Sequence, residues 1–163
     1  MLRLVLLVLP ALASVACGNV TFDVGSVQQR QQSGARVERV VDGDTVVLSG
    51  VGKARLIGVD TPEVYGGVEC YGRAASAYAK RTLTGRRVRW RYDVGKRDRY
   101  DRALVYLWLD DGRFFNSMLV REGFATPLTV PPNVEFADRF VADARAARRS
   151  SRGLWSACDG ARG

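Results

Sequence analysis

Arg55-Leu56-Ile57-Gly58-Val59-Asp60-Thr61-Pro62-Glu63 is an apolar segment bracketed by one arginine and an Asp-Thr-Pro-Glu turn. The apolar residues predict a buried strand that ends before Pro62. A second acidic turn, Asp42-Gly43-Asp44-Thr45, lies upstream between two β-rich segments, which is a strong hairpin signal. The two turns place carboxylates and a guanidinium at strand ends in a basic protein. Such a grouping indicates a metal site, and a metal beside a fixed arginine indicates phosphodiester chemistry.

The size and composition are those of one globular domain with a short extension. Of 163 residues, 47% are hydrophobic and 26% are charged, so a mid-sized core can form and wholesale disorder is disfavoured. The net charge of +8 favours a polyanionic partner, either nucleic acid or an anionic membrane, although a basic protein without such a partner is the simpler alternative. The sequence has no histidine, which excludes His triads, His zinc sites and imidazole bases.

The N-terminus has the pattern of an export signal. Met1-Leu2-Arg3 gives a positive start, and the apolar residues 4–12 are too few to span a bilayer as a stable helix. We expect residues 1–16 to be a signal peptide, with an uncleaved anchor as the alternative, and the Gln-rich residues 17–35 to be a polar tether. The protein would then be extracellular, periplasmic or anchored to a membrane.

The three cysteines comprise one near the N-terminus and a pair within the expected domain. Cys17 follows small residues as in a bacterial lipoprotein signal, so it is a candidate for lipidation and a membrane tether. Ser14 stands where such signals usually have Leu, which leaves ordinary cleavage before Cys17 open. Cys70 and Cys158 remain as a pair, and two cysteines in an exported protein predict a disulfide rather than a metal site.

Residues 36–158 predict one mainly β domain, followed by a short tail at 159–163. Strand patterns cover residues 37–41, 46–48, 53–59, 86–92 and 103–109. Helical patterns cover residues 71–83, 116–122 and 136–150. Five short strands with interspersed helices favour an α+β, mainly β fold. The five-stranded Greek-key barrel of the OB-fold, with the three helices packed outside, is the obvious candidate.

A linked set of motifs resembles the staphylococcal nuclease (thermonuclease) family in order and approximate spacing, over roughly residues 36–157. A lone Asp-Gly-Asp would be weak evidence, whereas the linked set is specific. The motifs are Asp42-Gly43-Asp44-Thr45, Arg55 to Glu63, Tyr71-Gly72-Arg73-Ala74-Ala75, Asp98 to Leu104, Leu119 to Ala125 and Gly153-Leu154-Trp155.

The resemblance implies an OB-fold barrel and a calcium-dependent endonuclease that cleaves DNA and RNA and leaves 3′-phosphates. Carried over by motif, Asp44 and Asp60 would bind calcium (Ca2+) through carboxylates, and Thr61 through its backbone carbonyl. Calcium prefers oxygen ligands and accepts irregular geometry, which agrees with this set. The structural alternative is a set of turn residues, and for Asp42 the turn role is the favoured interpretation.

The same resemblance gives Arg55 and Arg102 the role of gripping the phosphate. Their planar guanidinium groups match phosphate oxygens and stay charged at any working pH. Glu63 would orient or deprotonate the attacking water, and the sequence leaves these two roles open. As structural alternatives, Arg55 could form a plain ion pair with Glu63, and Arg102 could be one of many surface arginines.

The substrate-binding residues depart in part from the family pattern. Arg99 and Tyr100 are expected to contact the terminal phosphate of the substrate. Residues 126–133 contain no aromatic side chain where the type enzyme has two tyrosines, so we expect weaker substrate binding with the chemistry intact.

DNA and RNA are the expected partners, as substrates. No protein partner is implied, and a monomer is expected. The rival interpretation is a non-catalytic nucleic-acid-binding module, because OB-folds often bind single strands without cutting them.

Overall fold

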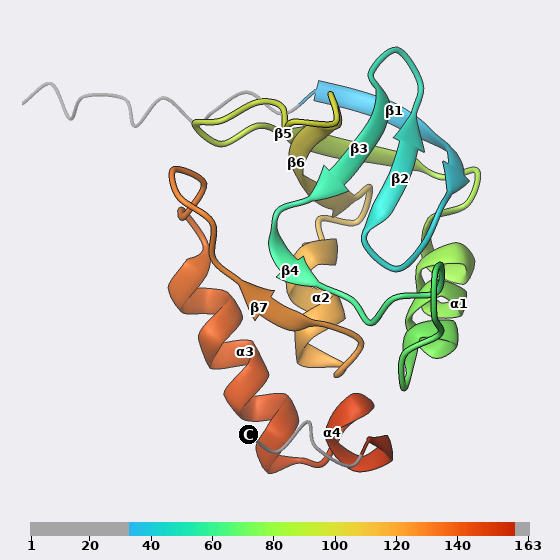
Figure 1. Ribbon diagram of the computed structural model, residues 1–163. Coiled ribbons are helices and arrows are strands. Elements are labelled where there is room, and N and C mark those ends of the chain that lie inside the picture. The colour runs from blue at the N-terminus through green and yellow to red at the C-terminus, as the bar shows by residue number, and fades with distance from the viewer. Residues whose placement is uncertain (1–32, 159–163) are drawn as a thin grey trace, which may run out of the picture.

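Five strands close into a barrel in the computed structural model, which describes residues 33–158 (Figure 1). They are β1 (Ser33–Val40), β2 (Thr45–Leu48), β3 (Gly52–Leu56), β5 (Arg87–Arg91) and β6 (Ala103–Leu109), in the order β1-β2-β3-β6-β5. All neighbours pair antiparallel except β3 and β6, which are parallel. The predicted five-stranded barrel is confirmed.

The first strand begins at Ser33, whereas we expected the domain to start at Arg36. The expected signal peptide, the candidate lipidation site Cys17, most of the tether and the tail at 159–163 lie outside the described residues.

Alternation along the strands separates the core from the outer surface. On β3, Ala54 and Leu56 are fully buried while Arg55 between them is partly exposed; on β6, Ala103 and Val105 are buried on either side of Leu104. A period of two is what a strand wall of a packed barrel requires. The outward positions of these two adjacent strands are therefore free to carry a functional site.

The predicted strand over residues 53–59 is wrong as one continuous element, because the chain turns at Gly58. Gly58 has a φ of 80°, and a Cβ there would lie 2.2 Å from the ring of Phe140. After this turn β4 (Gly58–Asp60) leaves the barrel and pairs with β7 (Thr126–Leu128). The short strand β7 was not predicted, since Pro127 lacks a backbone N–H and argues against a strand.

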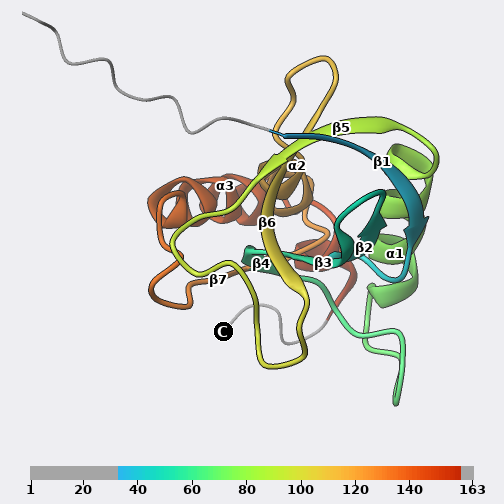
Figure 2. The same cartoon turned by 90° about the horizontal axis from the view of Figure 1, so that it is seen from above.

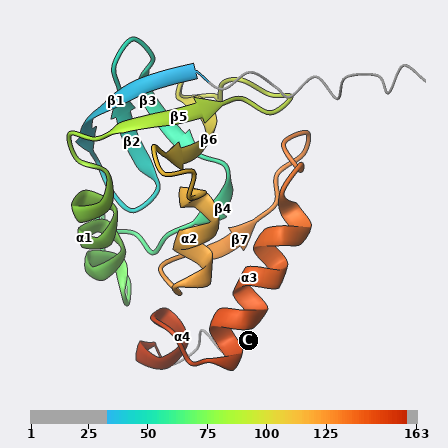
Figure 3. The ribbon, with the colours of Figure 1, turned by 180° about the vertical axis from the view of Figure 1, so that it is seen from behind.

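The three predicted helices are α1 (Gly72–Leu83), α2 (Phe115–Arg121) and α3 (Ala137–Arg149), and a one-turn helix α4 (Leu154–Ala157) follows. Viewed from above, α1 and α3 lie on opposite sides of the barrel (Figure 2), and from behind α2 is seen between them (Figure 3). The buried Asn116 joins α2 to the barrel, because it donates to the Ile57 carbonyl at 2.9 Å and accepts from the Leu107 N–H at 3.0 Å.

Cys70 and Cys158 form the predicted disulfide, with their Cα atoms 5.9 Å apart and a separation of 88 positions in the sequence. The bond ties the segment before α1 to the end of α4. Closing a loop of this length stabilises the fold by about 4–5 kcal/mol in the chain-entropy treatment. Among the residues described, none of the helices has the length and apolar character needed to cross a membrane.

Candidate active site

Strand register places Arg55 between the acidic turn and Arg102. Arg55 on β3 pairs with Thr45 of β2 on one side and with Leu104 of β6 on the other. Thr45 directly follows Asp44, and Arg102 lies two residues before Leu104, which puts it on the same face of the sheet. The outer wall of the barrel thus gathers a carboxylate and two guanidinium groups.

The Arg55 guanidinium connects both acidic turns. Its Nη1 donates to the carbonyls of Leu56 and Val59, each at 2.9 Å, and its Nη2 donates to Asp60 Oδ1 at 2.7 Å. Nη1 also lies 3.0 Å from Asp44 Oδ2. Only 14% of the Arg55 side chain is exposed, so it is a fixed link between Asp44 and Asp60.

Asp44 is a buried carboxylate that accepts hydrogen bonds from both Thr45 and Thr61. Oδ2 accepts the backbone N–H and the hydroxyl of Thr61, both at 2.8 Å, and Oδ1 accepts the Thr45 hydroxyl at 3.2 Å. Burial raises the pKa of Asp44 to about 6, although the Arg55 charge acts in the opposite direction. Gly43 allows this close approach, because a Cβ there would lie 2.6–2.7 Å from Thr61 side-chain atoms.

Asp98 holds Arg102 at the start of β6. Its Oδ2 accepts Arg102 Nε at 2.7 Å, and its Oδ1 accepts the backbone N–H groups of Arg102 and Tyr100 at 2.9 and 3.0 Å. Partial burial works to raise the pKa of Asp98, but these hydrogen bonds and the Arg102 charge outweigh it and lower that pKa. With 24% of its side chain exposed, Arg102 is a fixed group rather than a loose surface arginine.

Arg99 and Tyr100 lie together on the exposed loop before β6. Tyr100 is 64% exposed. The guanidinium groups of Arg99 and Arg102 lie over its ring, 4.8 and 5.4 Å from the centroid, and Arg99 Nη2 donates to the phenol oxygen at 2.7 Å. The loop therefore presents two cations and an aromatic face beside one another.

Arg55 and Arg102 line the same cavity of about 390 Å³. One wall is aliphatic and comes from Leu128 and residues 130–132, without an aromatic ring, as the sequence predicts. Asn133 joins this wall to the opposite loop: its Oδ1 accepts the Gly95 N–H at 2.7 Å and its Nδ2 donates to the Gly95 carbonyl at 3.1 Å. Two guanidinium groups beside an apolar wall suit a nucleotide, with phosphate on the cations and sugar or base on the wall.

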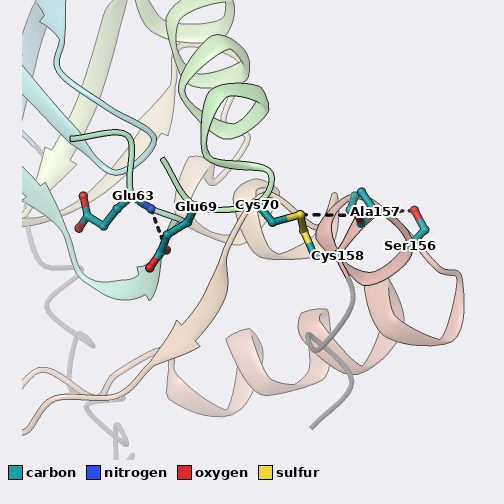
Figure 4. The surroundings of a disulfide bond; sticks show 7 residues. Glu63, Glu69, Cys70, Ser156, Ala157 and Cys158 are labelled. Carbon is teal, nitrogen blue, oxygen red and sulfur yellow. Dashed lines mark hydrogen bonds between the residues drawn. A yellow bond between two sulfur atoms is a disulfide. The ribbon is translucent and has the colours of Figure 1, made fainter. Parts of the chain in front are cut away.

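Glu63 stands apart from Arg55. Its side chain is exposed, and no ion pair joins the two within residues 33–158, so the plain Arg55–Glu63 pair is not found. Its backbone is held, because its N–H donates to Glu69 Oε2 at 2.9 Å and its carbonyl accepts the Glu69 N–H at 3.0 Å (Figure 4). The fold thus brings Asp44, Arg55 and Asp60 into contact and leaves the Glu63 carboxylate in solvent.

Asp44 and Asp60 are the carboxylates here that could offer oxygen ligands to a hard divalent cation. Both carboxylates contact one guanidinium, and Thr61 follows Asp60 directly in sequence. In the described part of the chain, no three Asp, Glu, His or Cys side chains gather into a cage. A cation here would therefore combine two carboxylates, a carbonyl and waters, which calcium accepts more readily than a metal that demands strict geometry.

Known proteins resemble this chain over most of its length. Residues 53–157 match the family described as staphylococcal nuclease homologue. The chain belongs to the staphylococcal nuclease family. The thermonuclease of Staphylococcus intermedius is 38% identical over 144 residues, which cover 85% of this chain and 84% of that protein. The thermonuclease of Staphylococcus hyicus is 36% identical over 141 residues, 83% of each chain. Endonuclease YncB of Bacillus subtilis (strain 168) is 32% identical over 139 residues, 80% of this chain and 65% of its own length. These relatives support a nuclease of this family.

Sequence reasoning missed several side chains that support the site, namely Asp98, Glu69 and Asn133. For Asp98 a signal existed, because it precedes Arg102 by four residues in a loop motif. For Glu69 and Asn133 no local pattern revealed the partner. The turn role predicted for Asp42 is confirmed, since its Oδ1 accepts the Asp44 N–H at 3.1 Å.

Proposed function

We propose that the protein is an exported, calcium-dependent endonuclease that hydrolyses phosphodiester bonds of DNA and RNA and leaves 3′-phosphates. The observation that carries this proposal is the Arg55 guanidinium, which contacts Asp44 and Asp60 and lines one cavity with Arg102. The names of the relatives, thermonuclease and endonuclease, agree with it. Export rests on the signal pattern of residues 1–16, and a lipid at Cys17 would add a membrane tether.

Arg55 keeps part of its guanidinium for a phosphate. Nη1 donates to two backbone carbonyls, and Nη2 donates to Asp60. Among the described residues, the Nε–H of Arg55 has no hydrogen-bond partner. This group lies on an edge of the guanidinium that can donate two parallel hydrogen bonds to phosphate oxygens. Arg102 binds Asp98 through Nε, which leaves its two Nη groups to face the substrate. The two cations would neutralise negative charge that gathers on the phosphate in the transition state.

Asp44, Asp60 and the Thr61 carbonyl would hold calcium, which when bound supplies positive charge that polarises the phosphate. Glu63 would act on the attacking water. Because a solvated glutamate is a weak base at neutral pH, orientation of the water is favoured over full proton abstraction. Arg99 and Tyr100 would contact a neighbouring phosphate or base of the same strand.

Digestion of DNA and RNA by the purified protein tests this function. We expect both to be cut at millimolar calcium, neither to be cut with chelator, and the products to carry 3′-phosphates. Arg102→Ala should lower the rate by about 10²–10³-fold. Arg113→Ala is the matched control, because Arg113 pairs with the exposed Asp111 outside the cavity.

Two outcomes would count against the proposal. If neither nucleic acid is cut at millimolar calcium, the enzyme assignment fails. If filter binding shows tight, calcium-independent association without turnover, a non-catalytic binding module is the better description. The mass of the mature N-terminus separately distinguishes a lipidated Cys17 from ordinary cleavage.

A further inference from the structure

The loop after Glu63 folds back onto the backbone of Glu63. Glu69 Oε2 accepts the Glu63 N–H at 2.9 Å, and the Glu69 N–H donates to the Glu63 carbonyl at 3.0 Å. Figure 4 shows the Glu69 carboxylate directed at the Glu63 nitrogen, while the Glu63 carboxylate points away from it. Both backbone hydrogen-bonding groups of Glu63 are thus satisfied by one residue.

Glu69 is itself anchored at its C-terminal side. The next residue, Cys70, is bonded to Cys158 at the end of α4. The Glu69 carbonyl accepts the N–H of Gly72, the first residue of α1, at 3.1 Å. Gly72 packs so closely that a Cβ there would lie 2.4 Å from the Glu63 carbonyl oxygen. Helix, disulfide and Glu63 backbone therefore form one connected unit.

The tip of the same loop has little to hold it. Gly66 and Gly67 have positive φ, and a Cβ at either would meet nothing within 4 Å. Tyr65 is the exception, because its hydroxyl donates to the Val41 carbonyl at 3.1 Å, beside the turn that carries Asp44. The placement of Glu63 then depends on anchors at the two ends of the loop rather than on packing of its tip.

We propose that Glu69 is a positioning residue for Glu63 and that the Cys70–Cys158 disulfide holds Glu69 in place. The inference rests on the proposed function, in which Glu63 acts on the attacking water. Among the described residues no hydrogen bond or ion pair holds the exposed Glu63 carboxylate, so its backbone sets the point from which the side chain reaches the site. A displacement of about 1 Å in a reacting group can cost about 10²-fold in rate.

Two substitutions at Glu69 separate its hydrogen bond from its charge. Glu69→Gln keeps an oxygen that accepts the Glu63 N–H and removes the charge, whereas Glu69→Ala removes both. We expect Glu69→Ala to lower kcat about 10–100-fold with little change in KM, because Arg55 and Arg102 still bind the phosphate. Glu69→Gln should keep most of the wild-type kcat. Val68→Ala, at an exposed neighbour on the same loop, is the matched control.

Amide hydrogen exchange at Glu63, followed by NMR, tests the positioning without reference to activity. The Glu63 N–H should exchange slowly in the wild-type protein and in Glu69→Gln. It should exchange about 10-fold faster in Glu69→Ala and in the Cys70→Ser/Cys158→Ser double variant. Circular dichroism at the assay temperature establishes that each variant is folded.

The outcomes are distinct. Equal loss of kcat in Glu69→Ala and Glu69→Gln would assign the effect to charge, and wild-type kcat in Glu69→Ala would remove any role; either overturns the proposal. Slow Glu63 exchange without the disulfide would overturn its anchoring part. A wild-type protein that protects this amide but cleaves no nucleic acid would instead refute the proposed function.

Discussion

Nη1 of Arg55 lies 3.0 Å from the buried Oδ2 of Asp44. The register between β2 and β3 sets this contact, since it puts Thr45 opposite Arg55. The same guanidinium donates to the carbonyls of Leu56 and Val59 and to Asp60, so it holds the chain at the end of β3. It also lines the cavity. Arg55 thus has a structural task and a proposed catalytic task, and substitutions can separate them.

Arg55→Lys should reduce both activity and stability. Lysine keeps the charge, but a single ammonium cannot donate at once to the carbonyls of Leu56 and Val59 and to Asp60. We expect kcat/KM to fall about 10²–10³-fold and the free energy of unfolding to fall by about 1–3 kcal/mol. Steady-state kinetics and urea unfolding measure the two effects. Lys53→Ala, on an exposed position of the same strand, should change neither; wild-type kinetics in Arg55→Lys would show that charge alone is sufficient.

Asp98→Asn should weaken the hold on Arg102 in a pH-dependent manner. The amide would face Arg102 Nε with a donor or with a neutral oxygen in place of a carboxylate. Because the folded-state pKa of Asp98 is lowered, its ionised form stabilises the fold above the unfolded-state pKa of about 3.9, and this contribution is lost as pH falls through the lower folded-state pKa. Urea unfolding at a series of pH values should show the variant less stable than wild type near neutral pH. The two should converge in acid, and a constant difference would contradict the role given to this carboxylate.

Local patterns were sufficient for the barrel because buried and exposed residues alternate along β3 and β5 and along part of β1. Ala54 and Leu56 enter the core on either side of Arg55, so the strand has only one face that can be buried. The candidate site residues Asp44, Arg55 and Asp60 come from two short motifs, and the fold brings these three side chains into contact. The contacts between these side chains depend on the register between β2 and β3, and the motifs alone do not give that register.

The remaining features depend on residues distant in sequence. At the turn, Gly58 packs against Phe140 of α3 with no room for a Cβ, and no pattern within residues 53–59 reveals that contact. β7 includes Pro127, whose missing N–H is tolerated at the edge of a two-stranded sheet. The hydrogen bond between Glu63 and Glu69 could not be predicted for a similar reason. Glu69 is held beside Glu63 by α1 and by the bond from Cys70 to Cys158 at the other end of the domain.

Thr61→Val should weaken calcium binding while the fold is kept. Valine has nearly the shape of threonine but loses the hydroxyl that donates to Asp44 Oδ2 at 2.8 Å. Loss of a group that orients a metal ligand typically costs about 10–100-fold in metal affinity. Activity measured against calcium concentration should shift to that extent, and Thr61→Ser should stay close to wild type. A calcium requirement that is unchanged in Thr61→Val would argue against Asp44 as a ligand.

Gly58→Ala should be more harmful than the same change at Gly50. Both glycines have positive φ, 80° and 73°, but a Cβ at Gly50 meets nothing within 4 Å whereas one at Gly58 lies 2.2 Å from the Phe140 ring. Gly50→Ala therefore isolates the backbone cost, about 1–2 kcal/mol, and Gly58→Ala adds about 1–3 kcal/mol of overpacking. Urea unfolding midpoints compare the two variants directly. The turn at Gly58 also sets the direction of β4, which ends at Asp60. Under conditions in which the variant is fully folded, Gly58→Ala should therefore still need more calcium for half-maximal activity. Equal midpoints in the two variants would mean that Phe140 yields easily and does not set the course of β4.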